Sequence, residues 1–317
     1  MKKRYLVLIL VILSLVSIFV GVKEISVRDI VNLNSSKIEV IFLSRVPRLI
    51  SVIVTGASLG IVGLIMQQIT RNKFVSPTTA GTEDFAKLGV VVALMFFTEA
   101  KSIEKMIIAF LFALIGTFIF MKIINRIKCK NDIFIPLVGL MLGGVVDSIS
   151  TFFAYKYDLV QNIGAWLQGD FSRIIKGRYE LLYFSIPMLV IAFVYANKFT
   201  LAGMGEDFAT NLGVNYKVVV NVGIVIVALV SSTVIITVGN IPFLGLIIPN
   251  IVTIYEGDNV KKSIVNIALF GGVFLLACDI LSRVIIYPYE IPIGLIVGII
   301  GSVMFLYLIK RRGVYGS

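Results

Sequence analysis

Two arginines at the edge of an apolar run are the residues whose type and spacing most directly suggest a binding site. Arg45 and Arg48 stand at i and i+3 in the sequence RVPR, just before an apolar stretch. Side chains three positions apart on a helix share one face, so both guanidinium groups can bind carboxylates on one partner. The plainer alternative is that they reach toward lipid headgroups, as basic residues at span ends often do.

Acidic residues inside apolar runs form the second group that can do chemistry. Asp147 lies in GGVVDSIS and Asp279 in ACDILSR, and a charge within a membrane span commonly marks a functional site. Asp279 stands four residues before Arg283, so the two can pair on one helix face and orient the arginine. Asp147 has no evident partner in the sequence, and a hydrogen bond within the helix bundle is its plainer interpretation.

The chemistry that the chain lacks narrows its function further. Its 317 residues include no histidine and two cysteines, Cys129 in a basic loop and Cys278 in an apolar run. We therefore expect no disulfide, no metal site and no common general-base arrangement. The phosphate-binding pattern GxxxxGK[ST] is also absent, so the chain is expected neither to be an enzyme nor to hydrolyse ATP by itself.

The composition places the chain in a lipid bilayer. Hydrophobic residues make up 58% and charged residues 15%, which is more apolar than a soluble core requires. Helices are the expected spans, because backbone polar groups in lipid must bond internally. The net charge of +11 comes from basic residues scattered between apolar runs, which indicates membrane topology rather than nucleic-acid binding.

Apolar runs bounded by charge predict an all-α polytopic membrane protein with a single domain that covers residues 1–317. The first run, after Lys2, Lys3 and Arg4, also suits a signal peptide, but its length favours a retained span. A modest excess of lysine and arginine on the inner side predicts that both termini are cytoplasmic. The ten predicted spans lie near residues 5–22, 48–68, 85–98, 103–124, 133–154, 179–197, 217–238, 243–256, 264–284 and 291–309.

Uncharged polar residues and helix breakers gather near the end of the second predicted span and within the eighth. They suit a path or inner gate for a polar cargo, because irregular backbone at membrane depth must be buried or line a cavity. A position at the water interface and simple helix punctuation are the alternatives. The candidate path or gate residues are Gln67, Gln68, Thr70, Asn72, Pro77 and Pro249.

Two glycine stripes repeat one spacing in separate apolar runs. Such stripes let helix backbones approach closely, which favours ordinary helix packing; a subunit interface or a moving gate is the alternative. The stripes are Gly56, Gly60 and Gly63, and Gly294, Gly298 and Gly301.

Four separated motifs together resemble the FecCD family, the permeases of ABC importers for ferric siderophores, haem and vitamin B12. RVPR, GASLGIVGLIMQQITRNKFVSPTTAG, GNIPFLGLIIPN and CDILSRVIIYPYEIPIGLIVGIIG occur in the family's order between about residues 45 and 310. The form QQITRNKFVSPTTAGTEDFAKLG is more similar to the petrobactin and anguibactin branch than to the vitamin B12 branch. The resemblance implies a type II importer fold of ten helices, with two permease subunits, two ATPases and a substrate-binding protein.

The resemblance also implies roles for particular residues. Arg45, Arg48 and Arg283 match arginines that pair with glutamates of the binding protein. Residues 198–216 match the cytoplasmic coupling helix that sits in a cleft of the ATPase, where ATP and Mg would bind. A plain amphipathic connector is the alternative for this segment, whose expected contact residues are Gly205, Glu206, Asp207, Phe208, Ala209, Leu212 and Gly213.

The resemblance favours a permease subunit that imports a ferric siderophore across a bacterial cell membrane. A haem or vitamin B12 permease of the same family is the alternative, and an ion-coupled secondary transporter using Asp147 or Glu256 is less favoured. The second permease subunit is expected to be a paralogue rather than an identical copy. Arg173, Lys176 and Arg178 at the outer mouth can assist an anionic chelate.

Overall fold

The computed structural model describes residues 3–21, 35–97, 99, 101–127, 134–177 and 179–315. Within these residues the named elements are helices, and β-structure is limited to two isolated bridges. This confirms the predicted all-α fold. Lys2, Cys129 and Arg178, which the sequence singles out, lie outside the described residues.

All ten predicted apolar runs contain helices. These are α1 (Lys3–Phe19), α4 (Val46–Thr70), α5 (Thr82–Phe96), α6 (Ser102–Arg126), α7 (Phe134–Lys156), α9 (Ser185–Val194) with α10 (Ala196–Gly203), α12 (Tyr216–Val238), α13 (Leu244–Glu256), α14 (Val260–Val284) and α15 (Ile293–Tyr315). The shorter elements between them are α3 (Ser35–Val40), the π-helix η1 (Ile41–Arg45), α8 (Val160–Leu167), the 3-10 helix η2 (Glu180–Phe184) and α11 (Glu206–Asn211).

The lengths of these helices divide them into two groups. Among the described residues, six helices are long and apolar enough to cross a membrane, and Glu180–Val194 with Ala196–Gly203, bent by 63°, makes a seventh if the pair is one span. The remaining three predicted spans, α1, α5 and α13, have 17, 15 and 13 residues. Short helices of this kind need neighbours to complete their burial, since about 20 residues are required to cross the hydrocarbon core.

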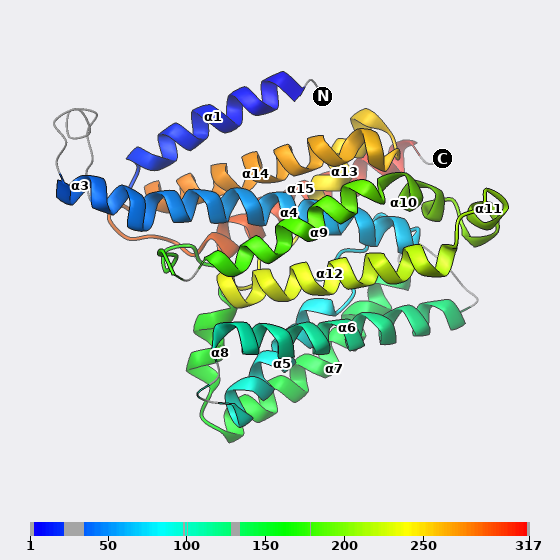
Figure 1. The fold of residues 1–317 in the computed structure, drawn as a ribbon, viewed down its shortest axis with the longest axis horizontal. Coiled ribbons are helices and arrows are strands. Elements are labelled where there is room, and N and C mark those ends of the chain that lie inside the picture. Colours follow the sequence, from blue (N-terminus) through cyan, green and yellow to red (C-terminus); the bar gives the residue numbers. More distant parts are fainter. Residues whose placement is uncertain are drawn as a thin grey trace.

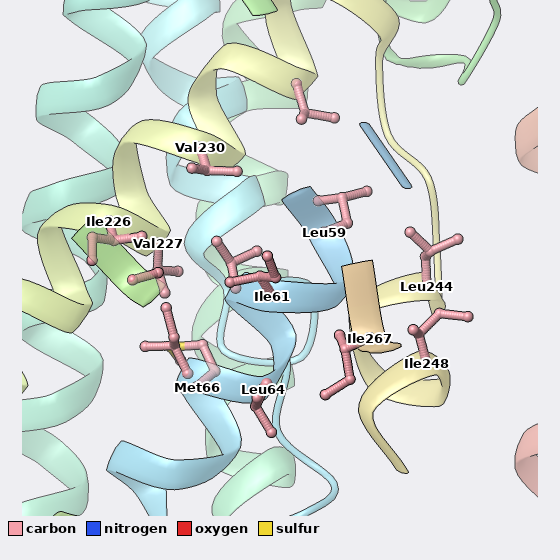
Figure 2. Close-up of a cluster of buried hydrophobic side chains, with 14 of the residues drawn as sticks. Leu59, Ile61, Leu64, Met66, Ile226, Val227, Val230, Leu244, Ile248 and Ile267 are labelled. Atoms are coloured by element: carbon pink, nitrogen blue, oxygen red, sulfur yellow. The ribbon is translucent and has the colours of Figure 1, made fainter. Parts of the chain in front are cut away.

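Helix α4 lies at the centre of the bundle, between α14 on one side and α12 on the other (Figure 1). It is the most buried of the six long spans. Figure 2 shows side chains of α4, α12, α13 and α14 meeting around it, among them Leu59, Met66, Ile226, Ile248 and Ile267. In a bilayer such packing stabilises through close van der Waals contact, because lipid is as apolar as the core.

The first glycine stripe allows α4 to touch two neighbouring backbones. A Cβ atom at Gly56 would lie 2.4 Å from the carbonyl oxygen of Gly271 in α14, and one at Gly63 would lie 1.8 Å from that of Gly245 in α13. The second stripe, on α15, faces the segment 240–243 of the same chain. Both stripes therefore serve packing within the chain, which supports the first interpretation of the pattern.

The two ends of α4 lie at opposite ends of the molecule. Figure 1 shows α3, which leads into α4, at one end and α11 at the other. At 1.5 Å per residue, the 25 residues of α4 cover about 37 Å, which is enough to cross a bilayer core of about 30 Å. The end that carries α3 is called the outer end below, and the end that carries α11 is called the inner end.

Candidate functional site

Arginines and carboxylates form a buried cluster at the outer end. Arg48 donates from Nε and Nη2 to Oδ1 of Asp279, at 3.1 and 2.9 Å, and from Nη1 to Oε2 of Glu290, at 2.6 Å. Arg283 binds the other carboxylate oxygen of Asp279, which confirms the predicted i, i+4 pair. Asp279 is fully buried, so one carboxylate within the bundle holds two guanidinium groups.

The same cluster closes the end of α1. Arg283 donates from Nη1 to the carbonyl oxygens of Ser17 and Val20, both at 2.9 Å, and Arg45 also donates to the carbonyl of Val20. The last turn of a helix has carbonyl groups without intrahelical partners and a partial negative charge, so guanidinium groups cap it well. These contacts tie the end of α1 to η1 and α14. The retention of the first span stays a prediction.

The three predicted docking arginines lie close together in the structure, but their side chains are buried. Arg45, Arg48 and Arg283 are only 9%, 8% and 2% exposed. Arg283 in particular is bonded to α1 and to its own helix, so in this conformation it acts as a tie between helices. Docking of a partner through these arginines stays a prediction. Arg48 is bonded to Glu290, whose side chain is 21% exposed.

The predicted path or gate residues come together only in part. Gln67, Gln68 and Asn72 line a cleft of about 440 Å³ at the inner end of α4. Sequence reasoning missed the charges beside them, because basic residues at a span end also fit ordinary membrane topology. The other residues that line the cleft are Arg71, Lys73, Thr200, Gly203, Met204, Asp258 and Asn259.

The remaining predicted gate residues do not line this cleft. Thr70 is buried and donates to the carbonyl of Met66 in its own helix, at 2.6 Å. Pro77 is buried in the turn that follows α4. Pro249 is buried inside α13, where it cannot donate to the carbonyl of Gly245, the group that Gly63 of α4 approaches. A role of these three residues in gating stays a prediction.

The predicted coupling segment, residues 198–216, runs from α10 through the short helix α11 to the start of α12 at the inner end (Figure 1). Gly205 precedes it with φ of +116°, a conformation that side chains other than glycine rarely adopt. Glu206 and Asp207 fill its first turn, where acidic side chains favour the helix dipole. Gly213, with φ of +76°, follows its end.

Two apolar side chains of this segment face solvent. Phe208 and Leu212 are exposed, whereas Ala209 is fully buried and holds α11 against the domain. Arg71, which ends α4 in a left-handed conformation, lies next to this segment: a Cβ atom at Gly205 would be 3.1 Å from its Nη1. The inner cleft and the coupling segment are therefore neighbours.

The prediction that Asp147 lacks an evident partner is wrong. Lys87 of α5 donates to the Asp147 carboxylate across 60 positions of sequence, which is why no local pattern revealed the pair. Glu256 accepts a hydrogen bond from Asn266. Both carboxylates on which an ion-coupled transporter would depend thus have partners in the structure.

The predicted outer-mouth residues lie on a loop beside the outer end of the bundle. The backbone N–H of Lys176 donates to the carbonyl of Leu43, at 3.1 Å, which holds this loop against η1. Arg173 and Lys176 are exposed, so their charges can meet a solute or a partner.

Sequence comparison matches residues 8–311 with the model of the FecCD transport family. The chain belongs to the FecCD transport family. It is 61% identical to the petrobactin import system permease protein YclN of Bacillus subtilis, over 99% of this chain and 100% of that protein. It is 38% identical to the ferric-anguibactin transport system permease protein FatD of Vibrio anguillarum, over 93% of this chain and 94% of that one.

The fold of this FecCD member also matches a solved structure. That chain comes from a protein described as a metal-chelate type ABC transporter in an inward-facing conformation. The TM-score is 0.84 at 23% identity, and the match covers 97% of this chain and 98% of the other. The similarity supports the predicted type II importer fold.

Proposed function

We propose that this chain is the permease subunit of an ABC importer that carries a ferric siderophore across a bacterial cell membrane. The observation that carries the proposal is the 61% identity to a petrobactin import permease over nearly the whole of both chains. The second permease subunit is proposed to be a paralogue. ATP and Mg would bind to a separate ATPase subunit, and the cargo would arrive on a substrate-binding protein.

The order of the helices supports the proposed orientation. The end of α1 and the start of α4 meet in the outer cluster, and α15 starts just after Glu290 of the same cluster. The beginning of α1 and the end of α15 therefore both point toward the inner end, where α11 lies. If α11 meets an ATPase, both termini are cytoplasmic and the arginine cluster faces the binding protein.

ATP-dependent uptake tests the proposal directly. The permease, its co-purified permease partner, the ATPase and the binding protein would be placed in proteoliposomes with radiolabelled ferric petrobactin, ferric anguibactin, haem and vitamin B12. Uptake of a ferric siderophore is expected, with none when the ATPase cannot hydrolyse ATP. Uptake of haem or vitamin B12 alone by the intact assembly would reassign the cargo, and uptake without ATPase would contradict the importer class.

Replacing Phe208 with serine is expected to reduce ATP-dependent uptake about tenfold or more while the permease still folds. Phe208 is 45% exposed, so its loss leaves no internal cavity, whereas an exposed aromatic anchor can carry much of the energy of a protein contact. The measurements are uptake in proteoliposomes and co-purification of the ATPase with the permease.

The matched control for this prediction is Tyr255→Ser. Tyr255 is 64% exposed and lies near the inner end of α13, outside the coupling segment, so its replacement should leave the ATPase bound. Equal uptake by the Phe208→Ser and Tyr255→Ser proteins would show that α11 is a plain connector.

A further inference from the structure

Arg48 uses its donors in two directions. Its Nε and Nη2 bind Asp279, which is fully buried in the last turns of α14, whereas Nη1 binds Glu290. The Glu290 side chain is 21% exposed, against 0% for Asp279. The Nε and Nη2 edge of the guanidinium is therefore fixed inside the bundle. Nη1 is bonded to a carboxylate that solvent and partners can reach.

Glu290 lies at the base of an exposed turn. The backbone N–H of Tyr289 donates to the carbonyl of Ile286, at 2.8 Å, and closes a turn between α14 and α15. Ile286, Tyr287 and Tyr289 on this turn are all more than half exposed. Asp279 lies within the long helix α14, whereas Glu290 lies between the exposed turn and Ile291, whose backbone N–H donates to the carbonyl of Ser282 at 3.0 Å. A rotation of the Glu290 side chain is therefore enough to release Arg48, without unfolding any helix.

We infer that Glu290 is a placeholder carboxylate, which occupies Nη1 of Arg48 until an acidic side chain of the substrate-binding protein replaces it. The inference rests on the proposed function, because it requires a binding protein that docks at the outer end. The exchange replaces one charge-assisted hydrogen bond by another. Arg48 keeps its two bonds to Asp279 throughout, so no buried guanidinium is left without a carboxylate during docking.

This arrangement makes Glu290 a competitor of the binding protein. The incoming carboxylate must displace an existing partner, so the gain on docking is the difference between two similar hydrogen bonds. The binding protein is thereby held less tightly than it would be by an unoccupied arginine, and it can leave after the cargo is delivered. The apolar and aromatic side chains of the turn at 286–289 provide the remaining contact surface.

The experiment measures the affinity of the loaded binding protein for the complete importer in lipid nanodiscs. Glu290→Gln keeps the size of the side chain but removes its charge, which weakens its hold on Arg48. The affinity is expected to rise about threefold to tenfold, the range for losing part of one charge-assisted hydrogen bond. In an Arg48→Gln background, Glu290→Gln should leave the affinity the same as that of the Arg48→Gln protein, because no arginine remains for Glu290 to occupy. Thermal unfolding of each variant verifies that the protein is folded.

Glu180→Gln is the matched control. Glu180 begins η2, next to the outer-end loop, and accepts a hydrogen bond from the backbone N–H of Gly177, so this variant removes the same charge from the same end without touching Arg48. An equal rise with Glu180→Gln, or unchanged or weaker binding with Glu290→Gln, would overturn the placeholder role and leave the proposed function intact. If the wild-type importer binds no binding protein at all, the docking proposal itself fails and the placeholder falls with it.

Discussion

Replacing Asp279 with asparagine is expected to prevent the permease from accumulating as a folded protein. Asp279 is fully buried and accepts hydrogen bonds from both Arg48 and Arg283. Removing one partner of a buried ion pair costs about 3–5 kcal/mol, because the remaining charge is left without compensation. Since folded proteins are stable by only about 5–15 kcal/mol, the loss is a large fraction of the total. The measurement is the yield of monodisperse protein in detergent and the midpoint of its thermal unfolding.

Asp258→Asn makes the same chemical change in an exposed pair. Asp258 pairs with Lys73, and the two side chains are 59% and 31% exposed, so solvent screens the interaction and its loss should cost at most about 1 kcal/mol. The Asp258→Asn protein should therefore match the wild type in folded yield and in the midpoint of thermal unfolding. If Asp279→Asn is equally stable, the outer cluster does not hold α1, α4 and α14 together.

The parts of this outer cluster that sequence reasoning found are the local ones. Asp279 and Arg283 lie one helical turn apart, and Arg45 and Arg48 share the short motif RVPR, so their spacing alone predicts a common face. The bond from Arg48 to Glu290 joins residues 242 positions apart. It depends on how α14, the turn after it and α4 are arranged, and no local pattern records that arrangement.

The positions of the helices could likewise be predicted because they depend on local sequence. Hydropathy is a local property, so every predicted apolar run contains a helix in the structure. The 63° bend between α9 and α10 depends on neighbouring helices, and the sixth run showed no sign of it. At the polar end of α4, Gln67, Gln68 and Asn72 line a cleft, whereas Thr70 donates to its own helix. Residue type alone does not distinguish these two arrangements, and a path or gate stays a prediction.

The close approach of α4 and α13 depends on glycine at position 63, where there is no side chain. Pro249 leaves the carbonyl of Gly245 without its usual helical donor, and the backbone of Gly63 lies directly against that carbonyl. Gln67, one turn further along α4, donates to the carbonyl of Leu246, at 3.3 Å. The contact thus positions α13 relative to the helix that leads into the inner cleft.

Gly63→Ala is expected to reduce the folded yield and the uptake severely. The added Cβ atom would lie 1.8 Å from the carbonyl oxygen of Gly245, so one helix must move, at a cost of roughly 3 kcal/mol for strong overpacking, or about 100-fold in the folding equilibrium. Gly298→Ala is the control, since its Cβ would meet only Pro242, at an ordinary 3.6 Å, and alanine favours a helix by about 1 kcal/mol. Thermal unfolding and uptake of the two variants should differ sharply; equal behaviour would show that α4 and α13 can separate at no cost, and that their contact does not position the cleft.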